Sequence, residues 1–217
     1  MTATEPLRPD LARELIARAT QSAARRAQRV RNQLDAVQLG QDRHADHANA
    51  KVLRRILAEH DWPGHRLVGA DAARAAWSLA LHADDDADFQ RAATALLERA
   101  VQDGDARIQH WARLYDRTLA NSGRPQEFGT QLVLSATGVE LCLVRAPDSL
   151  DQRRASVALS PIAVALETVR SRFAPDRHAD DSSTVVLAEV ARPSGPRPLN
   201  RSDSTTDPSY LKRTVEV

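Results

Sequence analysis

The stretch Gly123-Arg124-Pro125-Gln126-Glu127-Phe128-Gly129-Thr130-Gln131 separates a helical part of the chain from a β-like part. Two glycines and a proline fix where the backbone can turn, and the amide and hydroxyl side chains offer hydrogen bonds without net charge. Loops that rigid elements hold in place often carry binding and catalytic residues. We therefore expect the fold to change here and a polar site to lie beside it.

The residues before this stretch carry apolar side chains at helical spacing. The spacing predicts a long amphipathic helix over residues 11–37 that Gly40 interrupts, so residues 1–40 are assigned to an N-terminal helix. A second helix is predicted from about Asp46 to the sequence Asp61-Trp62-Pro63-Gly64, where the proline and the last glycine favour a turn.

Three more helices are predicted between that turn and residue 123. Asp71 would cap the first, which ends near His82, the acidic residues 84–86 would open the second, and Asp105 would open the third. Short connections between successive helices favour antiparallel neighbours in a bundle.

The pattern changes beyond Gly129. Residues 131–134 and 139–144 flank a turn at Thr137-Gly138, which predicts one β-hairpin near residues 131–145, and two short helices follow from Pro147 and Pro161. Residues 175–217 are predicted to be a largely disordered tail, because Pro, Ser, Thr, Asp and Arg dominate them. The expected fold class is mainly α: an α+β helical bundle with one appended β-hairpin, whose core domain spans residues 41–174.

Length, composition and net charge restrict the classes of fold and partner that this chain can have. The chain has 217 residues, of which 42% are hydrophobic, so it can bury one sizeable core. Its net charge of +1 creates no field that would gather polyanions, and we expect no nucleic-acid partner. The basic residues are almost all arginine, which together with abundant alanine indicates a bacterial coding bias.

The sequence predicts a cytoplasmic protein that contacts no membrane. Its first residues lack the basic and apolar regions of a secretory signal, and no apolar run approaches the roughly 18 residues of a membrane span. Cys142 is the single cysteine, so no intramolecular disulfide can form.

A set of short motifs resembles a bacterial family classed as domain of unknown function 6624. The motifs are Trp62-Pro63-Gly64, Leu67-Val68-Gly69, Ala75-Ala76-Trp77, His82-Ala83-Asp84, Phe89-Gln90, Asp116-Arg117 and the 123–131 stretch itself. The resemblance covers residues 46–159. This chain has Phe128 where the family usually has tyrosine and Leu81 where it usually has glutamine, so each position lacks a polar group. The resemblance implies no particular activity.

The leading hypothesis is a polar pocket that the bundle and the 123–131 turn form around a small molecule or peptide. His82 would be the catalytic acid or base, because the neighbouring carboxylates favour its charged form, and Asp116 would orient it or act as a second acid. Two alternatives stay open. His82 could cap the end of its helix, and Asp116-Arg117 could contribute an ion pair that locks its helix.

The ligand-binding groups of this hypothesis are basic and amide or hydroxyl side chains around the turn. They are Arg117, Arg124, Gln126, Thr130, Gln131 and Arg154. The same uncharged groups could instead satisfy the backbone of a tight helix-to-strand connection, and Arg154 could lie on a solvated helix face.

We expect no metal and no cofactor. His44 and His47 are three residues apart, but no HExxH pattern or cysteine pair accompanies them. The sequence also lacks a nucleophile elbow and a glycine-rich phosphate loop, so any reaction would be non-redox acid–base chemistry. The alternative function is a non-enzymatic structural or interaction module, whose N-terminal helix docks on a protein partner or a second copy of the chain.

Overall fold

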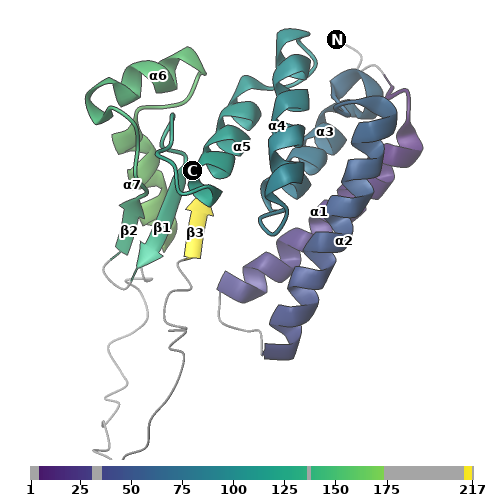
Figure 1. Ribbon diagram of the computed structural model, residues 1–217, viewed down its shortest axis with the longest axis horizontal. Helices are drawn as coiled ribbons and strands as arrows, with labels where there is room; N and C mark the ends of the chain where they lie inside the picture. Colours follow the sequence, from purple (N-terminus) through teal and green to yellow (C-terminus); the bar gives the residue numbers. More distant parts are fainter. Residues whose placement is uncertain (1–4, 31–35, 136–137, 174–212, 217) are drawn as a thin grey trace, which may run out of the picture.

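The structure is a computed structural model that describes residues 5–30, 36–135, 138–173 and 213–216. Five helices come first: α1 (Pro9–Val30), α2 (Ala36–His60), α3 (His65–Leu81), α4 (Ala87–Gln102) and α5 (Ile108–Asn121). The strands β1 (Gln131–Ser135) and β2 (Gly138–Leu141), the 3-10 helix η1 (Pro147–Ser149), α6 (Leu150–Ser156), α7 (Ile162–Phe173) and β3 (Arg213–Glu216) follow. Figure 1 shows α1–α4 on one side of the molecule, the sheet with α6 and α7 on the other, and α5 between them.

The predicted hairpin is confirmed, and with it the mainly α fold class. Strand β1 pairs antiparallel with β2, with Leu132 opposite Leu141. Strand β3 pairs antiparallel with the other edge of β1, with Leu132 opposite Val215, so the strand order is β2-β1-β3. This third strand was not predicted, because its pairing partner lies far away in the sequence. The rest of the predicted tail, residues 175–212, lies outside the described residues.

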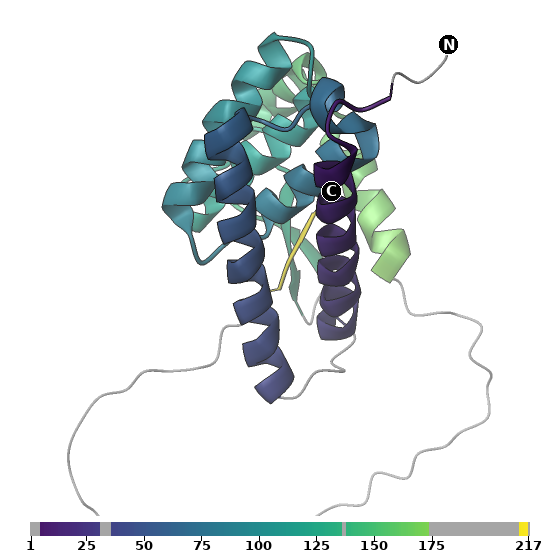
Figure 2. The same cartoon turned by 90° about the vertical axis from the view of Figure 1, so that its right-hand side faces the viewer.

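The predicted boundary of the N-terminal helix is wrong. Helix α1 ends at Val30, and α2 begins at Ala36 and runs through Gly40 without a break. A glycine inside a helix costs only about 1 kcal/mol relative to alanine, which packing against neighbouring helices can offset. Figure 2 shows α1 and α2 side by side along one flank of the bundle.

The start of α3 also differs from the prediction. The helix begins at His65 and is kinked at Gly69, where φ is 80°, so the predicted start at Asp71 falls just after the kink. Asp105 caps α3 in place of opening α5: its backbone oxygen accepts from the His65 N–H at 2.9 Å, and its carboxylate from the Arg66 N–H at 2.8 Å.

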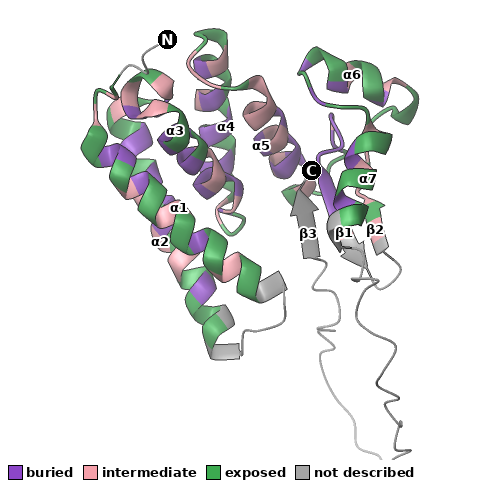
Figure 3. Cartoon of the chain, turned by 180° about the vertical axis from the view of Figure 1, so that it is seen from behind, coloured by how far each residue is buried: buried purple, intermediate pink, exposed green. Residues whose placement is uncertain are grey.

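One apolar core joins the first five helices. Figure 3 shows the buried residues on their facing sides, and α1 contributes Leu11, Ala12 and Leu15 to this core. A smaller cluster contains Ala112, Phe128, Val157 and Leu159, and it fastens the 123–131 turn between α5 and the segment after α6. Phe128 is therefore a core residue, and the candidate site lies between the two clusters.

Candidate functional site

A buried carboxylate of α5 holds the turn that the sequence singled out. Asp116 has no exposed surface. Its Oδ1 accepts from the backbone N–H groups of Glu127 at 2.8 Å and Phe128 at 3.0 Å. Its Oδ2 accepts from the backbone N–H of Thr130 at 2.9 Å and from the Thr130 hydroxyl at 3.0 Å. Both oxygens are thus engaged by the turn itself.

The electrostatics of Asp116 reflect this position. Burial raises the pKa of the Asp116 carboxyl, and the hydrogen bonds from Phe128, Thr130 and Glu127 act in the opposite direction. Asp116 and Arg117 neither pair with each other nor point into one pocket. In this arrangement Asp116 anchors the turn, and neither of its oxygens is left over to orient His82.

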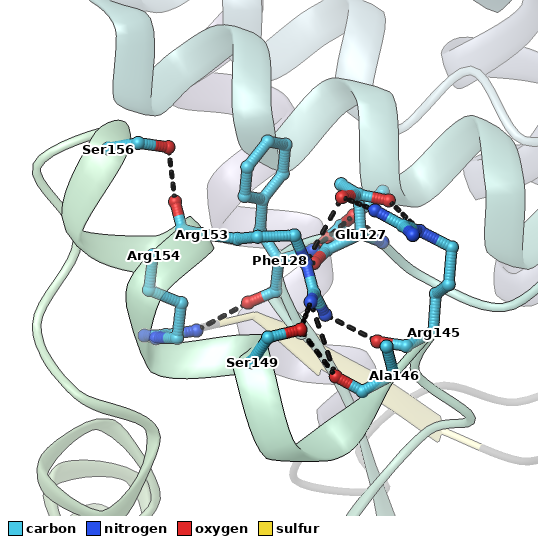
Figure 4. A network of polar contacts seen from close by, with 9 residues as sticks. Glu127, Phe128, Arg145, Ala146, Ser149, Arg153, Arg154 and Ser156 are labelled. Carbon is cyan, nitrogen blue, oxygen red and sulfur yellow. Dashed lines mark hydrogen bonds and ion pairs between the residues drawn. The ribbon is translucent and has the colours of Figure 1, made fainter.

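Arg154 holds the other side of the same turn. Its Nη1 donates to the carbonyl oxygen of Phe128 at 2.7 Å (Figure 4). The same Nη1 donates to the Gly129 carbonyl at 3.2 Å, and the Nε donates to the Ser160 carbonyl at 2.6 Å. Its side chain is 1% exposed, so the alternative that Arg154 lies on a solvated helix face is wrong. Burial lowers the pKa of its guanidinium. The turn is therefore held between a carboxylate that accepts from its N–H groups and a guanidinium that donates to its carbonyls.

Three charged residues that the sequence analysis did not select fasten the turn to α6. The Glu127 carboxylate pairs with Arg145 at 2.7 Å and with Arg153 at 3.1 Å (Figure 4). The Arg153 Nε also donates to the backbone oxygen of Glu127 at 2.8 Å. The Arg145 guanidinium holds the pKa of Glu127 below its usual value. Opposite charges at sites so far apart in sequence give no local signal, so sequence inspection could not have paired them.

Two glutamines connect the turn to the hairpin. The Gln126 Oε1 accepts from the backbone N–H of Gln131 at 2.6 Å, and its Nε2 donates to the backbone oxygens of Gln131 at 3.0 Å and Cys142 at 3.3 Å. The Gln131 side chain donates to the Thr130 hydroxyl at 3.1 Å. Gln126, Thr130 and Gln131 are fully buried. These contacts are those of the structural alternative, in which uncharged side chains satisfy the backbone of a tight connection.

The same network continues to the end of α3. The Arg117 Nη1 donates to the Gln131 side chain at 3.1 Å, and its Nε donates to Asp84 at 2.8 Å. Asn121 donates to Asp84 and to the Gln90 side chain, both at 2.9 Å. The motif residues Asp84, Gln90, Arg117 and Gln131 therefore form one connected set. Its accessible end is Asp84, whose side chain is 40% exposed.

The pKa of Asp84 lies below its usual value. Burial on its own would raise this pKa, but the hydrogen bond and charge of Arg117 lower it, with smaller contributions from Asn121 and His82. Because the pKa is lowered in the folded state, the ionised form of Asp84 stabilises the fold.

We predict that Asp84→Asn destabilises the protein by about 1 kcal/mol at neutral pH, the range for a partly exposed charged pair. An unfolded aspartate has a pKa near 3.9, so the contribution is complete above that pH and is lost as the pH falls through the folded-state pKa. Urea unfolding at pH 7 and pH 3 should show the difference between variant and wild type shrinking in acid. The exposed neighbour Asp85→Asn is the control, and a difference that does not change with pH would contradict the assignment.

His82 and Arg124 occupy the edge of this network. His82 follows the last residue of α3, its backbone N–H donates to the Ala80 oxygen, and its side chain is partly exposed. Arg124 is exposed, and its backbone N–H donates to the Leu119 oxygen at 2.9 Å. The structure thus gathers Asp116, Arg117 and the three uncharged residues into one network, with Arg154 behind the turn and Arg124 outside it.

A cavity of about 270 Å³ lies beside Arg117, between the end of α5 and the hairpin. Arg117, Asn121, Arg124 and Gln126 line its polar side. Val133, Cys142 and Leu143 line its apolar side. This cavity is where the selected residues of the turn meet accessible space.

The fold and the network define a mainly helical protein built around a turn that buried charges hold on two sides. Residues 9–173 match a family of unknown function (DUF6624), and the chain belongs to that family. No curated protein and no solved structure matches the chain significantly. The family resemblance found in the motifs is confirmed.

Neither a metal-binding cluster nor a membrane-spanning helix occurs among the described residues. Within them, no three His, Cys, Asp or Glu side chains come together in a way that could hold a metal ion. None of the helices in the described part of the chain is long and apolar enough to cross a membrane.

Proposed function

We propose that the protein binds a small molecule or a peptide segment in the cavity beside Arg117. The observation that carries this proposal is the cavity itself, which opens where polar motif residues meet the apolar side of the hairpin. Ligand sites in proteins commonly combine an apolar lining with a few polar groups that fix orientation.

The lining suggests the chemistry of the ligand. Val133, Cys142 and Leu143 offer an apolar surface, while Arg124 stands exposed with no side-chain hydrogen bond or ion pair to any described residue. Arg117, in contrast, is paired with Asp84. A ligand with an apolar body and a carboxylate would cover the apolar surface and supply a partner for Arg124.

Binding is favoured over acid–base catalysis. The two oxygens of Asp116 are taken by the turn, and His82 does not line the cavity. The interaction-module alternative receives no specific support, because Leu11, Ala12 and Leu15 of α1 pack into the core of their own chain.

The test fills the cavity. Ala120 lies on its α5 side, so Ala120→Leu should place three extra carbons in the space that a ligand would use. We expect hexanoate or phenylacetate to raise the thermal midpoint of the wild type in a saturable way and to leave Ala120→Leu unchanged, with the midpoint read by differential scanning fluorimetry.

The matched control is Ala155→Leu, which makes the same change at an exposed position of α6. Hexanoate and phenylacetate should raise the thermal midpoint of this variant as they raise that of the wild type. The proposal fails if neither carboxylate shifts the wild-type midpoint, or if Ala120→Leu still responds fully.

A further inference from the structure

A second cavity, of about 350 Å³, lies at the opposite end of α3 from His82. The end of α2, the start of α3 and the end of α4 meet there. Its apolar side is formed by Trp62, Leu67, Leu96 and Ala100. This volume falls within the range of small-ligand sites, and none of its lining residues belongs to the candidate site described above.

Three charged side chains at this cavity, those of Asp61, Arg99 and Asp103, have no partner among the described residues. Asp61 and Arg99 both line it and both are exposed. Neither side chain makes a hydrogen bond or ion pair with a described residue, so their charged atoms are more than 4.0 Å apart. Arg66, on the same cavity, is already paired with Asp105 at 3.4 Å. A ligand that carries both charges could bridge Asp61 and Arg99, which do not reach each other.

A buried indole adds a hydrogen-bond donor. Trp62 is 5% exposed, and its N–H donates to no described residue. It differs from Trp77 and Trp111, whose N–H groups are wholly buried without a partner. The Trp62 N–H therefore keeps some accessible surface, and the cavity is the space that this side chain lines. An indole N–H can only donate, so it fits an acceptor such as a carboxylate.

The backbone holds Asp61 in an unusual conformation. Its φ is 56°, in the left-handed region that few residues other than glycine, asparagine and aspartate adopt. Residues held in such conformations are concentrated at functional sites.

We propose that this cavity binds an α-amino acid with a large apolar side chain. The carboxylate of the ligand is held by Arg99 and the Trp62 N–H, its ammonium group is held by Asp61, and its side chain covers the apolar surface. Both charges of the ligand contribute, because each meets a side chain that has no other partner among the described residues.

The first test observes Trp62 directly. The chain has three tryptophans, so a ¹⁵N–¹H spectrum of the full-length protein shows at most three indole N–H signals, and Trp62→Phe identifies one of them. Titration with L-leucine or L-phenylalanine should shift the Trp62 signal saturably and leave those of Trp77 and Trp111 nearly unchanged. A Trp62 signal that does not move with either amino acid overturns the proposal.

Charge-neutral variants then test each contact. Arg99→Gln and Asp61→Asn keep the size of each side chain, and asparagine tolerates the backbone angle at position 61. Each should weaken L-leucine binding at least about tenfold, as expected for loss of a charge-assisted hydrogen bond. The control is Arg91→Gln, because Arg91 is an exposed arginine of the same helix that pairs with Asp88. Equal weakening by all three variants would contradict the assignment.

Blocked ligands separate the two charges. N-acetyl-L-leucine lacks the ammonium group, so its weaker binding should respond to Arg99→Gln and not to Asp61→Asn. L-leucinamide lacks the carboxylate, so its binding should be weakened by Asp61→Asn and not by Arg99→Gln. If either blocked compound shifts the Trp62 signal with the affinity of L-leucine, the amino-acid assignment is wrong. The residues probed differ from those beside Arg117, so this result is independent of the proposed function.

Discussion

Deletion of residues 1–35 is expected to unfold the remaining chain. Helix α1 lies along α3 and α2, and Leu11, Ala12 and Leu15 belong to the same core cluster as Leu53 and Leu97. Removing α1 would expose this apolar surface to water at about 25 cal/mol per Å², a loss that a marginally stable domain cannot absorb. Far-UV circular dichroism and a thermal melt of the shortened chain would measure it.

Two leucine substitutions in the full-length chain also test whether the core contacts of α1 stabilise the fold. Leu15 is fully buried, whereas Leu7 is 74% exposed. Leu15→Ala should cost about 2–5 kcal/mol, as buried leucine truncations do, and Leu7→Ala should change stability by less than about 0.5 kcal/mol. A shortened chain that stays folded and loses a binding partner would instead favour the interaction module.

Asp116→Ala is expected to have the second largest effect. The substitution leaves the buried N–H groups of Glu127, Phe128 and Thr130 without an acceptor. It also leaves the buried Arg154 guanidinium without one of the carboxylates whose charge favours its protonated form. Losses of this kind amount to about 3–5 kcal/mol, or roughly 10 °C in thermal midpoint for a domain of this size.

Asp85→Ala is the comparison, because Asp85 is exposed in the loop before α4. It should leave the thermal midpoint within about 1–2 °C of the wild type. If Asp116→Ala were as stable as Asp85→Ala, the carboxylate would not be holding the turn, and a role in chemistry would have to be reconsidered.

The motif residues form one continuous structure. Asp84 lies in the loop between α3 and α4, and Gln90 lies in the first turn of α4. Asp116 and Arg117 lie on α5, and Gln126, Thr130 and Gln131 lie in the turn and the hairpin. The hydrogen bonds that link them run from the bundle to the sheet. These residues therefore place the hairpin on the bundle, and the cavity beside Arg117 is a consequence of that placement.

Helices and the hairpin could be predicted because their signals are local. Apolar spacing set the helical character of residues 87–102 and 108–121, and Thr137-Gly138 marked the turn between two short apolar runs. The end of α2 at Asp61-Trp62-Pro63-Gly64 was also predicted correctly. Helix starts were less well predicted, because packing tolerates Gly40 inside α2 and because the cap of α3 comes from Asp105, many residues away.

The sequence by itself determined the mainly α fold class, the hairpin, the family and the set of polar residues around the 123–131 turn. Each of these depends on neighbours in the chain or on a motif. Only the tertiary structure decided what the polar residues contact: Asp116 accepts from the turn, Arg154 donates to it from behind, and Arg117 reaches across to Asp84. Hydrogen bonds between distant segments depend on how the helices pack, and no local pattern records that packing.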